Sequence, residues 1–129
     1  MFGVVLDTSG SMDRHLLATA LGSIASYSEA RDVKYVRVVF CDAAPYDQGI
    51  MSPDDLAGYV KVKGRGGTKL QPAIDLLDDD PKFPKDAPLL IITDGCCDRL
   101  NLRGRNHAYL VPWGYRLPFQ PNGPVFKLK

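Results

Sequence analysis

The sequence lacks a hydrophobic run approaching the roughly 18 residues that a membrane span needs. Its N-terminus also lacks the basic segment of a signal peptide, and the first apolar run already ends at Asp7. Neither sign of charge is in excess, since 16 Lys and Arg against 15 Asp and Glu leave a net charge of +1. These absences argue against a membrane protein and against a strongly basic nucleic-acid surface, so we expect a cytoplasmic protein.

The chain is also poor in cysteine and histidine. Its three cysteines, Cys41, Cys96 and Cys97, are odd in number, and adjacent cysteines rarely bridge each other. A disulfide framework is therefore not expected, which suits a reducing compartment. A zinc site formed by these thiols and His107 would lack any C-x-x-C spacing, so we interpret them as small, partly buried thiols.

Motifs of common catalytic sites are missing as well. The sequence contains no H-E-x-x-H, and no local context suggests a Ser-His-Asp set. The glycine-rich stretch 64–68 is too short for a phosphate-binding loop, and its Thr68 precedes Lys69 instead of following it. Asp7-x-Ser9 has a serine where D-x-D phosphatases need an acid. We therefore expect no catalysis by this chain itself.

What the chain does have is a regular alternation of strand and helix patterns over one domain, residues 1–129. Helices are predicted at 13–30, at 53–60 with Ser52 as its cap, and directly after Thr68. Strands are predicted at 2–6, 35–40, 46–51, 89–93, 108–111 and 125–128. This order predicts a three-layer α/β/α fold with a doubly wound, mostly parallel sheet. Because the first strand begins beside Met1, we expect a piece of a longer protein or a pared-down domain.

Oxygen-bearing side chains follow two of these strands and precede one helix. Asp7, Ser9 and Ser11 come after the first strand, Thr68 lies at the glycine-rich loop, and Asp94 follows the strand 89–93. In a doubly wound sheet those two strands are neighbours at the switch point, so Asp7 and Asp94 should meet at one edge. Oxygen-only ligands suit a hard cation such as Mg²⁺.

Each part of this set also has a simpler interpretation. The two serines suit the N-cap of the first helix. Thr68 with Gln71 fits a capping box, and the Asp94-Gly95 pair fits a turn. The joint occurrence of all of them in this order favours the metal site.

The remaining charged residues are assigned to the surface. The acidic run 78–80 is interpreted as a solvated loop without metal, Asp98 as a loop acid and Asp13 as a helix-dipole residue. Basic and polarisable side chains are expected around the metal edge, where they would favour an acidic partner. These are Met12, Arg14, Arg65, Lys69, Arg99, Arg103 and Arg105.

The segments Asp7-Thr8-Ser9-Gly10-Ser11, Gly66-Gly67-Thr68 and Thr93-Asp94-Gly95 resemble the metal-ion-dependent adhesion site (MIDAS) of von Willebrand factor A (VWA) domains. The resemblance covers essentially the whole chain. Cys41-Asp42-Ala43 and the Pro-Trp and Phe near the end further resemble a bacterial VWA-like group. In that group the domain stands at the C-terminus, behind a metallopeptidase-like region.

The resemblance implies a role for each residue. Ser9 and Ser11 would bind the ion directly, Thr68 directly or through water, and Asp7 and Asp94 mainly through bound waters. The ion would be Mg²⁺, with Mn²⁺ or Ca²⁺ as substitutes, and its open position would take an Asp or Glu of a partner protein. We expect Asp42, after the second strand, to hydrogen-bond one of the waters.

The expected function is thus a metal-dependent protein-binding module, with an AAA-type ATPase as a partner class by resemblance only. Neither nucleic acid nor membrane is expected as a partner. Two alternatives stay open. The chain is a non-catalytic domain of a larger metallopeptidase-like hydrolase, or it is an assembly domain with a vestigial site that associates through its sheet edge or tail.

Overall fold

The computed structural model describes residues 1–8, 14–57 and 69–128. Within these residues the chain forms one six-stranded sheet and three helices. The strands are β1 (Phe2–Asp7), β2 (Val36–Cys41), β3 (Pro45–Met51), β4 (Leu89–Ile92), β5 (His107–Pro112) and β6 (Val125–Leu128). The helices are α1 (Arg14–Ala30), α2 (Pro53–Ala57) and α3 (Gln71–Asp79). None of these helices is both long and apolar enough to cross a membrane.

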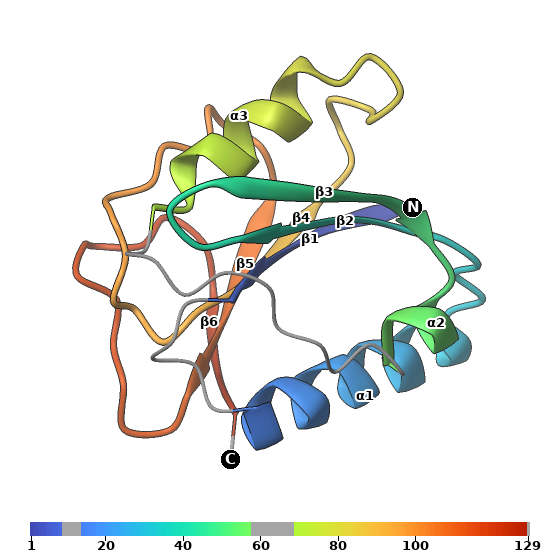
Figure 1. The fold of residues 1–129 in the computed structure, drawn as a ribbon, viewed down its shortest axis with the longest axis horizontal. Coiled ribbons are helices and arrows are strands. Elements are labelled where there is room, and N and C mark those ends of the chain that lie inside the picture. Colours follow the sequence, from blue (N-terminus) through green and yellow to red (C-terminus); the bar gives the residue numbers. More distant parts are fainter. Residues whose placement is uncertain (9–13, 58–68, 129) are drawn as a thin grey trace.

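The strand order is β3-β2-β1-β4-β5-β6. Only β3 runs antiparallel to its neighbour, and the other four pairings are parallel. This is a doubly wound order with its switch point between β1 and β4. Figure 1 shows α3 on one face of the sheet and α1 with α2 on the other. The predicted three-layer, mostly parallel α/β/α fold is confirmed.

The core is divided by the sheet into two clusters. Val5 and Ile91 face α3 and pack with its Leu77, whereas Val4 faces α1 and packs with Leu21. Neighbouring residues of β1 therefore point to opposite buried faces, which is why its sequence is an unbroken apolar run. A strand buried on both faces is held rigidly, and it positions the residue at its carboxyl end, Asp7.

Two local predictions about helix starts have different outcomes. The Ser52 hydroxyl accepts a hydrogen bond from the Asp55 N–H at 3.1 Å, so the predicted cap of α2 is confirmed. The predicted capping box of α3 is wrong, because Gln71 is the first residue of the helix. The Gln71 side chain hydrogen-bonds the Asn101 backbone instead. The Asp98 carboxylate takes over, accepting from the backbone N–H of Leu70 at 2.8 Å and of Gln71 at 3.3 Å. Asp98 is therefore a capping residue and not simply a loop acid.

The prediction that the acidic run 78–80 forms a solvated loop is wrong. Asp78 accepts hydrogen bonds from Arg103 at 2.8 Å and from Arg105 at 3.0 Å, and its side chain is largely buried. Asp80 accepts from Arg37 Nε at 2.9 Å. These ion pairs connect α3 to the 98–106 loop and to β2. They form because a nearly buried arginine needs a counter-ion.

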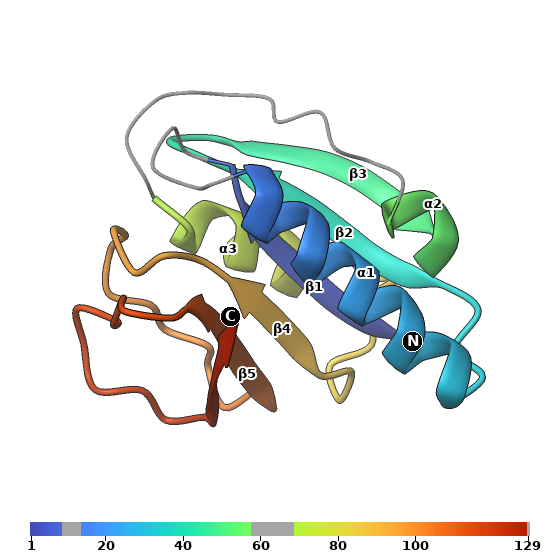
Figure 2. The same ribbon diagram turned by 90° about the horizontal axis from the view of Figure 1, so that it is seen from below.

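One part of the sheet is left without a helix on one face. Figure 2 shows α1 lying across β1 and β2, while no helix of the described chain covers β4 and β5 on that side. An apolar groove of about 720 Å³ lies there, lined among others by Ile24, Tyr27, Leu90, Leu110 and Phe126. Tyr27 and Phe126 are both more than half exposed.

Candidate functional site

The carboxyl ends of β1 and β4 bring two polar side chains into contact. Because Leu6 pairs with Ile92, Asp7 and Thr93 lie side by side at the edge of the sheet. The Thr93 hydroxyl donates to Asp7 Oδ2 at 2.7 Å and accepts from the Gly95 N–H at 3.1 Å. Asp7 and Thr93 are both fully buried. The Asp7 carboxylate is therefore held in a fixed orientation.

Asp94 follows Thr93 directly, and one of its oxygens has no hydrogen bond from the part of the chain that the structure describes. Its Oδ1 accepts from the Cys96 N–H at 2.9 Å, while Oδ2 is buried and has no hydrogen bond among the described residues. Only 2% of Asp94 is exposed. The Thr8 hydroxyl is likewise buried and has no partner in residues 1–8, 14–57 and 69–128. Since a buried, unsatisfied carboxylate oxygen is costly, this donor set fits a bound cation or its waters.

Asp42 closes the site on the β2 side. It is 3% exposed, and its Oδ1 accepts from the Ala44 N–H at 3.0 Å. Its backbone carbonyl accepts from the Lys69 N–H at 2.7 Å, which holds the segment entering α3 against the end of β2. Asp42 follows Cys41, the residue that pairs with Asp7, so it lies at the same edge of the sheet on the β2 side of β1.

Of the predicted ligands, Asp7 and Asp94 lie at the same edge of the sheet, after the neighbouring strands β1 and β4. Ser9, Ser11 and Thr68 lie outside the described residues. No three or more His, Cys, Asp or Glu side chains within residues 1–8, 14–57 and 69–128 form a group that could hold a metal. The predicted site, with two carboxylates and three hydroxyls, would not be such a group.

The thiols near this edge are poor metal ligands in this state. Burial raises the pKa of Cys41 and of Cys97 to about 12, and nearby aspartates act in the same direction. The Asp94 charge is the largest cause of the raised pKa of the exposed Cys96 thiol. Because thiolates rather than thiols bind zinc, these raised pKa values count against a zinc site. The interpretation as partly buried thiols suits Cys41 and Cys97 but is wrong for Cys96, which is exposed.

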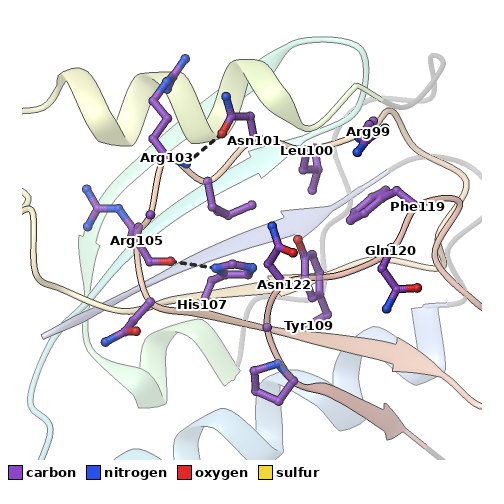
Figure 3. Close-up of a pocket in the computed structure, with 15 residues that line it drawn as sticks. Arg99, Leu100, Asn101, Arg103, Arg105, His107, Tyr109, Phe119, Gln120 and Asn122 are labelled. Carbon is purple, nitrogen blue, oxygen red and sulfur yellow. Dashed lines mark hydrogen bonds between the residues drawn. The ribbon is translucent and has the colours of Figure 1, made fainter.

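The predicted location at the metal edge is wrong for two basic residues, Arg103 and Arg105. Figure 3 shows the Arg103 side chain reaching toward α3, where it pairs with Asp75 and Asp78. Arg105 is buried and pairs with Asp78. Lys69 is exposed beside Asp42. Arg14 has no described side chain, and Met12 and Arg65 lie outside the described residues.

A second hollow, of about 340 Å³, lies between the 99–107 segment and the 119–124 segment (Figure 3). His107 Nδ1 donates to the Arg105 carbonyl at 2.8 Å, and the buried Nε2 has no partner among the described residues. Gly123 packs closely against this ring, because a Cβ added to Gly123 would lie 3.0 Å from Nε2. The histidine nitrogen is thus covered by backbone, and we assign no site to this hollow.

Sequence reasoning missed two residues of the site. Thr93 was recognised only as part of a motif, and Thr8 was given no role. The signal that identifies Thr93 is its place between a buried strand and an acid, where a hydroxyl is expensive to bury without a partner. Nothing in the sequence distinguishes the buried Thr8 from an exposed turn threonine.

Comparisons with known proteins agree with the fold. Residues 2–97 match the sequence model of a family described as VWA-like domain (DUF2201). A crystal structure of an aerotolerance-related membrane protein from Bacteroides fragilis, with multiple mutations to serine, superposes with a TM-score of 0.70. The two chains are 16% identical, and the match covers 99% of this chain and 90% of that one. No curated protein sequence gives a match.

Proposed function

Because this chain belongs to the family of VWA-like domains, we propose that it is a non-catalytic protein-binding module that holds Mg²⁺ at the carboxyl edge of its sheet. The ligands would be Asp7, Ser9, Ser11, Thr68 and Asp94. The observation that supports this most is the buried Oδ2 of Asp94, which has no hydrogen bond within the described residues, at the same sheet edge as the fixed carboxylate of Asp7. A cation at this edge would supply the partner that a buried carboxylate oxygen needs.

The chain's own residues prepare this edge before anything binds. Thr93 fixes the Asp7 carboxylate, and the Cys96 N–H fixes one oxygen of Asp94, so little rotamer freedom remains to be lost. A bound Mg²⁺ would supply an electron-poor centre that accepts an oxygen from a partner's Asp or Glu. The two aspartates would balance the ion's charge and leave its partner-facing side open.

The first test is a titration of the purified chain with Mg²⁺ and Mn²⁺, followed by thermal unfolding. We expect stabilisation by millimolar Mg²⁺ and its loss with a chelator. Asp7→Ala and Ser9→Ala should abolish this effect and leave the circular dichroism spectrum unchanged. Asp86→Ala, at an exposed acid before β4, is the matched control and should respond like the wild type.

The second test is a pull-down with and without chelator, which asks whether captured proteins depend on the metal. An AAA-type ATPase among the Mg²⁺-dependent partners would agree with the expected partner class. Capture that is unchanged by chelation, or by Asp7→Ala, would contradict the proposal.

A second candidate function is assembly of two copies through the apolar groove between α1 and β5. The exposed Tyr27 and Phe126 on its walls favour this, as does the outer edge of β6, which pairs with no described strand. Light scattering of the wild type and of Phe126→Ser tests it. A monomer at all concentrations would exclude it.

A further inference from the structure

The chain leaves β5 through a segment with three exposed side chains, Trp113, Tyr115 and Arg116, which we call the aromatic corner. Trp113 is 68% exposed and Tyr115 is 47% exposed, and Arg116 is exposed as well. Trp, Tyr and Arg are the residue types enriched at binding hot spots.

The corner borders the candidate metal site. Ile92 pairs with Leu110, and the Thr93 N–H donates to the Leu110 carbonyl at 3.2 Å. The chain after β5 therefore emerges at the same edge of the sheet as Asp94. The two segments also touch, because a Cβ on Gly95 would lie 2.1 Å from the Arg116 carbonyl oxygen. Nothing larger than glycine fits between the metal-site turn and the corner.

The backbone of the corner is fixed although its side chains are exposed. The Trp113 N–H donates to the Leu128 carbonyl at 2.7 Å, and the Tyr115 N–H donates to the Pro112 carbonyl at 3.1 Å. Lys127 Nζ donates to the Tyr115 carbonyl. Little backbone entropy would be lost on binding to such a segment, which is a property of preorganised recognition surfaces.

We propose that the aromatic corner is the second half of the partner-binding surface, and that it takes an apolar or aromatic side chain of the same partner segment that supplies the carboxylate. This inference rests on the proposed function. Arg116 adds a positive charge beside the ion, so an acidic segment is favoured over a neutral or basic one.

The spacing of the strands sets the spacing within the partner segment. Neighbouring strands are about 5 Å apart, so β5 lies about 10 Å from β1 across β4. An extended peptide advances about 3.3 Å per residue. Because side chains on one face of an extended peptide are two or four residues apart, the apolar side chain should stand about two to four residues from the acidic one.

Another exposed aromatic residue supplies a control. Tyr35, which is 56% exposed, directly precedes β2 and so lies at the amino end of the sheet, away from the site. Trp113→Ala and Tyr35→Ala thus remove similar exposed area from opposite ends of the molecule.

The test uses a library of synthetic dodecapeptides with one fixed Asp and all other positions random, selected on the immobilised full chain in Mg²⁺. We expect enrichment of an aromatic or large apolar residue about two to four positions from the Asp. Trp113 is the only tryptophan in the chain, so a bound peptide should shift its emission to shorter wavelength. Addition of Mg²⁺ alone should leave the emission nearly unchanged.

Variants then separate the two halves of the surface. Trp113→Ala should weaken the selected peptides about tenfold and remove the apolar preference, because a hot-spot side chain contributes on this scale. Binding should still require Mg²⁺ and the Asp. Tyr35→Ala should bind like the wild type. If Trp113→Ala affects folding, the test is repeated with Tyr115→Ala and Trp113→Phe, after their thermal unfolding has been shown to be unchanged.

The outcomes distinguish this inference from the function it rests on. Peptides that need Mg²⁺ and Asp but show no apolar preference, or that leave the Trp113 emission unchanged, would overturn the inference and leave the proposed function standing. Selected peptides that ignore chelation and Asp→Asn replacement would overturn the proposed function, and the inference with it.

Discussion

Thr93 donates a buried hydrogen bond to Asp7 at 2.7 Å, although the two residues are 86 positions apart in the chain. The bond joins the carboxyl ends of β1 and β4, the two strands at the switch point of the sheet. Its direction is fixed, because the carboxylate can only accept and the hydroxyl already accepts from the Gly95 N–H. One hydroxyl thus orients both the first acid of the candidate site and the turn that carries the second.

Thr93→Val keeps the shape of this side chain and removes its hydroxyl. We expect the free energy of unfolding to fall by about 1–3 kcal/mol, because a buried carboxylate loses a donor. Urea denaturation at neutral pH measures this. Thr93→Ser retains the hydroxyl, so its free energy of unfolding should fall by less. Equal stability of the Val variant and the wild type would contradict the role of the Thr93 hydroxyl as a donor to Asp7.

Asp94→Asn removes a buried charge and keeps an oxygen for the Cys96 N–H. Without metal, the free energy of unfolding should be unchanged or higher, since one of two neighbouring acids has been neutralised. With Mg²⁺ at 100 times its dissociation constant, the wild type should gain about 2.7 kcal/mol and the variant almost nothing. Unfolding with and without Mg²⁺ tests both parts, and an equal gain in both proteins would exclude Asp94 from the site.

Gly95→Ala places a methyl group against the Arg116 carbonyl, at a residue whose φ is +87°. Gly104 has a similar φ of +78° but open space around it. We expect Gly104→Ala to lower the free energy of unfolding by about 1 kcal/mol, from backbone strain alone. Gly95→Ala should lower it clearly more. Thermal unfolding of the pair isolates the steric part, and equal losses would show that the contact with Arg116 yields easily.

Acid should weaken the ion pairs of the buried Arg37. The Arg37 guanidinium lowers the pKa of Asp47 through a bidentate contact at 2.5 and 3.0 Å. The pKa of Asp80 is lowered by the Lys82 N–H and by Arg37. At low pH the unfolded chain binds more protons than the folded one, so stability should fall as the pH drops below about 4. Urea unfolding from neutral to acidic pH should show a shallower decline in Arg37→Met, and an unchanged slope would contradict this.

The strands were predictable because each consists of residues that a two-sided core selects. Residues 36–41 are buried throughout, and their β-branched and aromatic sequence already indicated this. The edge strand β3 has only intermediate or exposed residues, and its sequence signal was correspondingly weak. The pairing of Asp7 with the end of β4 followed from the doubly wound order, which the alternation of elements predicts.

The partners of charged side chains were not predictable in the same way. Arg103 and Arg105 follow the turn at Asp94 in sequence, yet they extend to Asp78 at the far end of α3. Asp98 caps a helix that begins 27 residues before it. Long side chains reach across several elements, so neighbours in sequence do not indicate their partners.

By itself the sequence determined the order of strands and helices, the two-sided core and the meeting of two acids at one edge, because hydrophobic periodicity and parallel topology are local and repetitive signals. Only the tertiary structure decided that Thr93 holds Asp7, that one oxygen of Asp94 has no hydrogen bond from the described residues, and that the aromatic corner touches the turn at Gly95. Those relationships depend on distances of a few ångströms between segments far apart in the chain, which packing sets and composition does not encode.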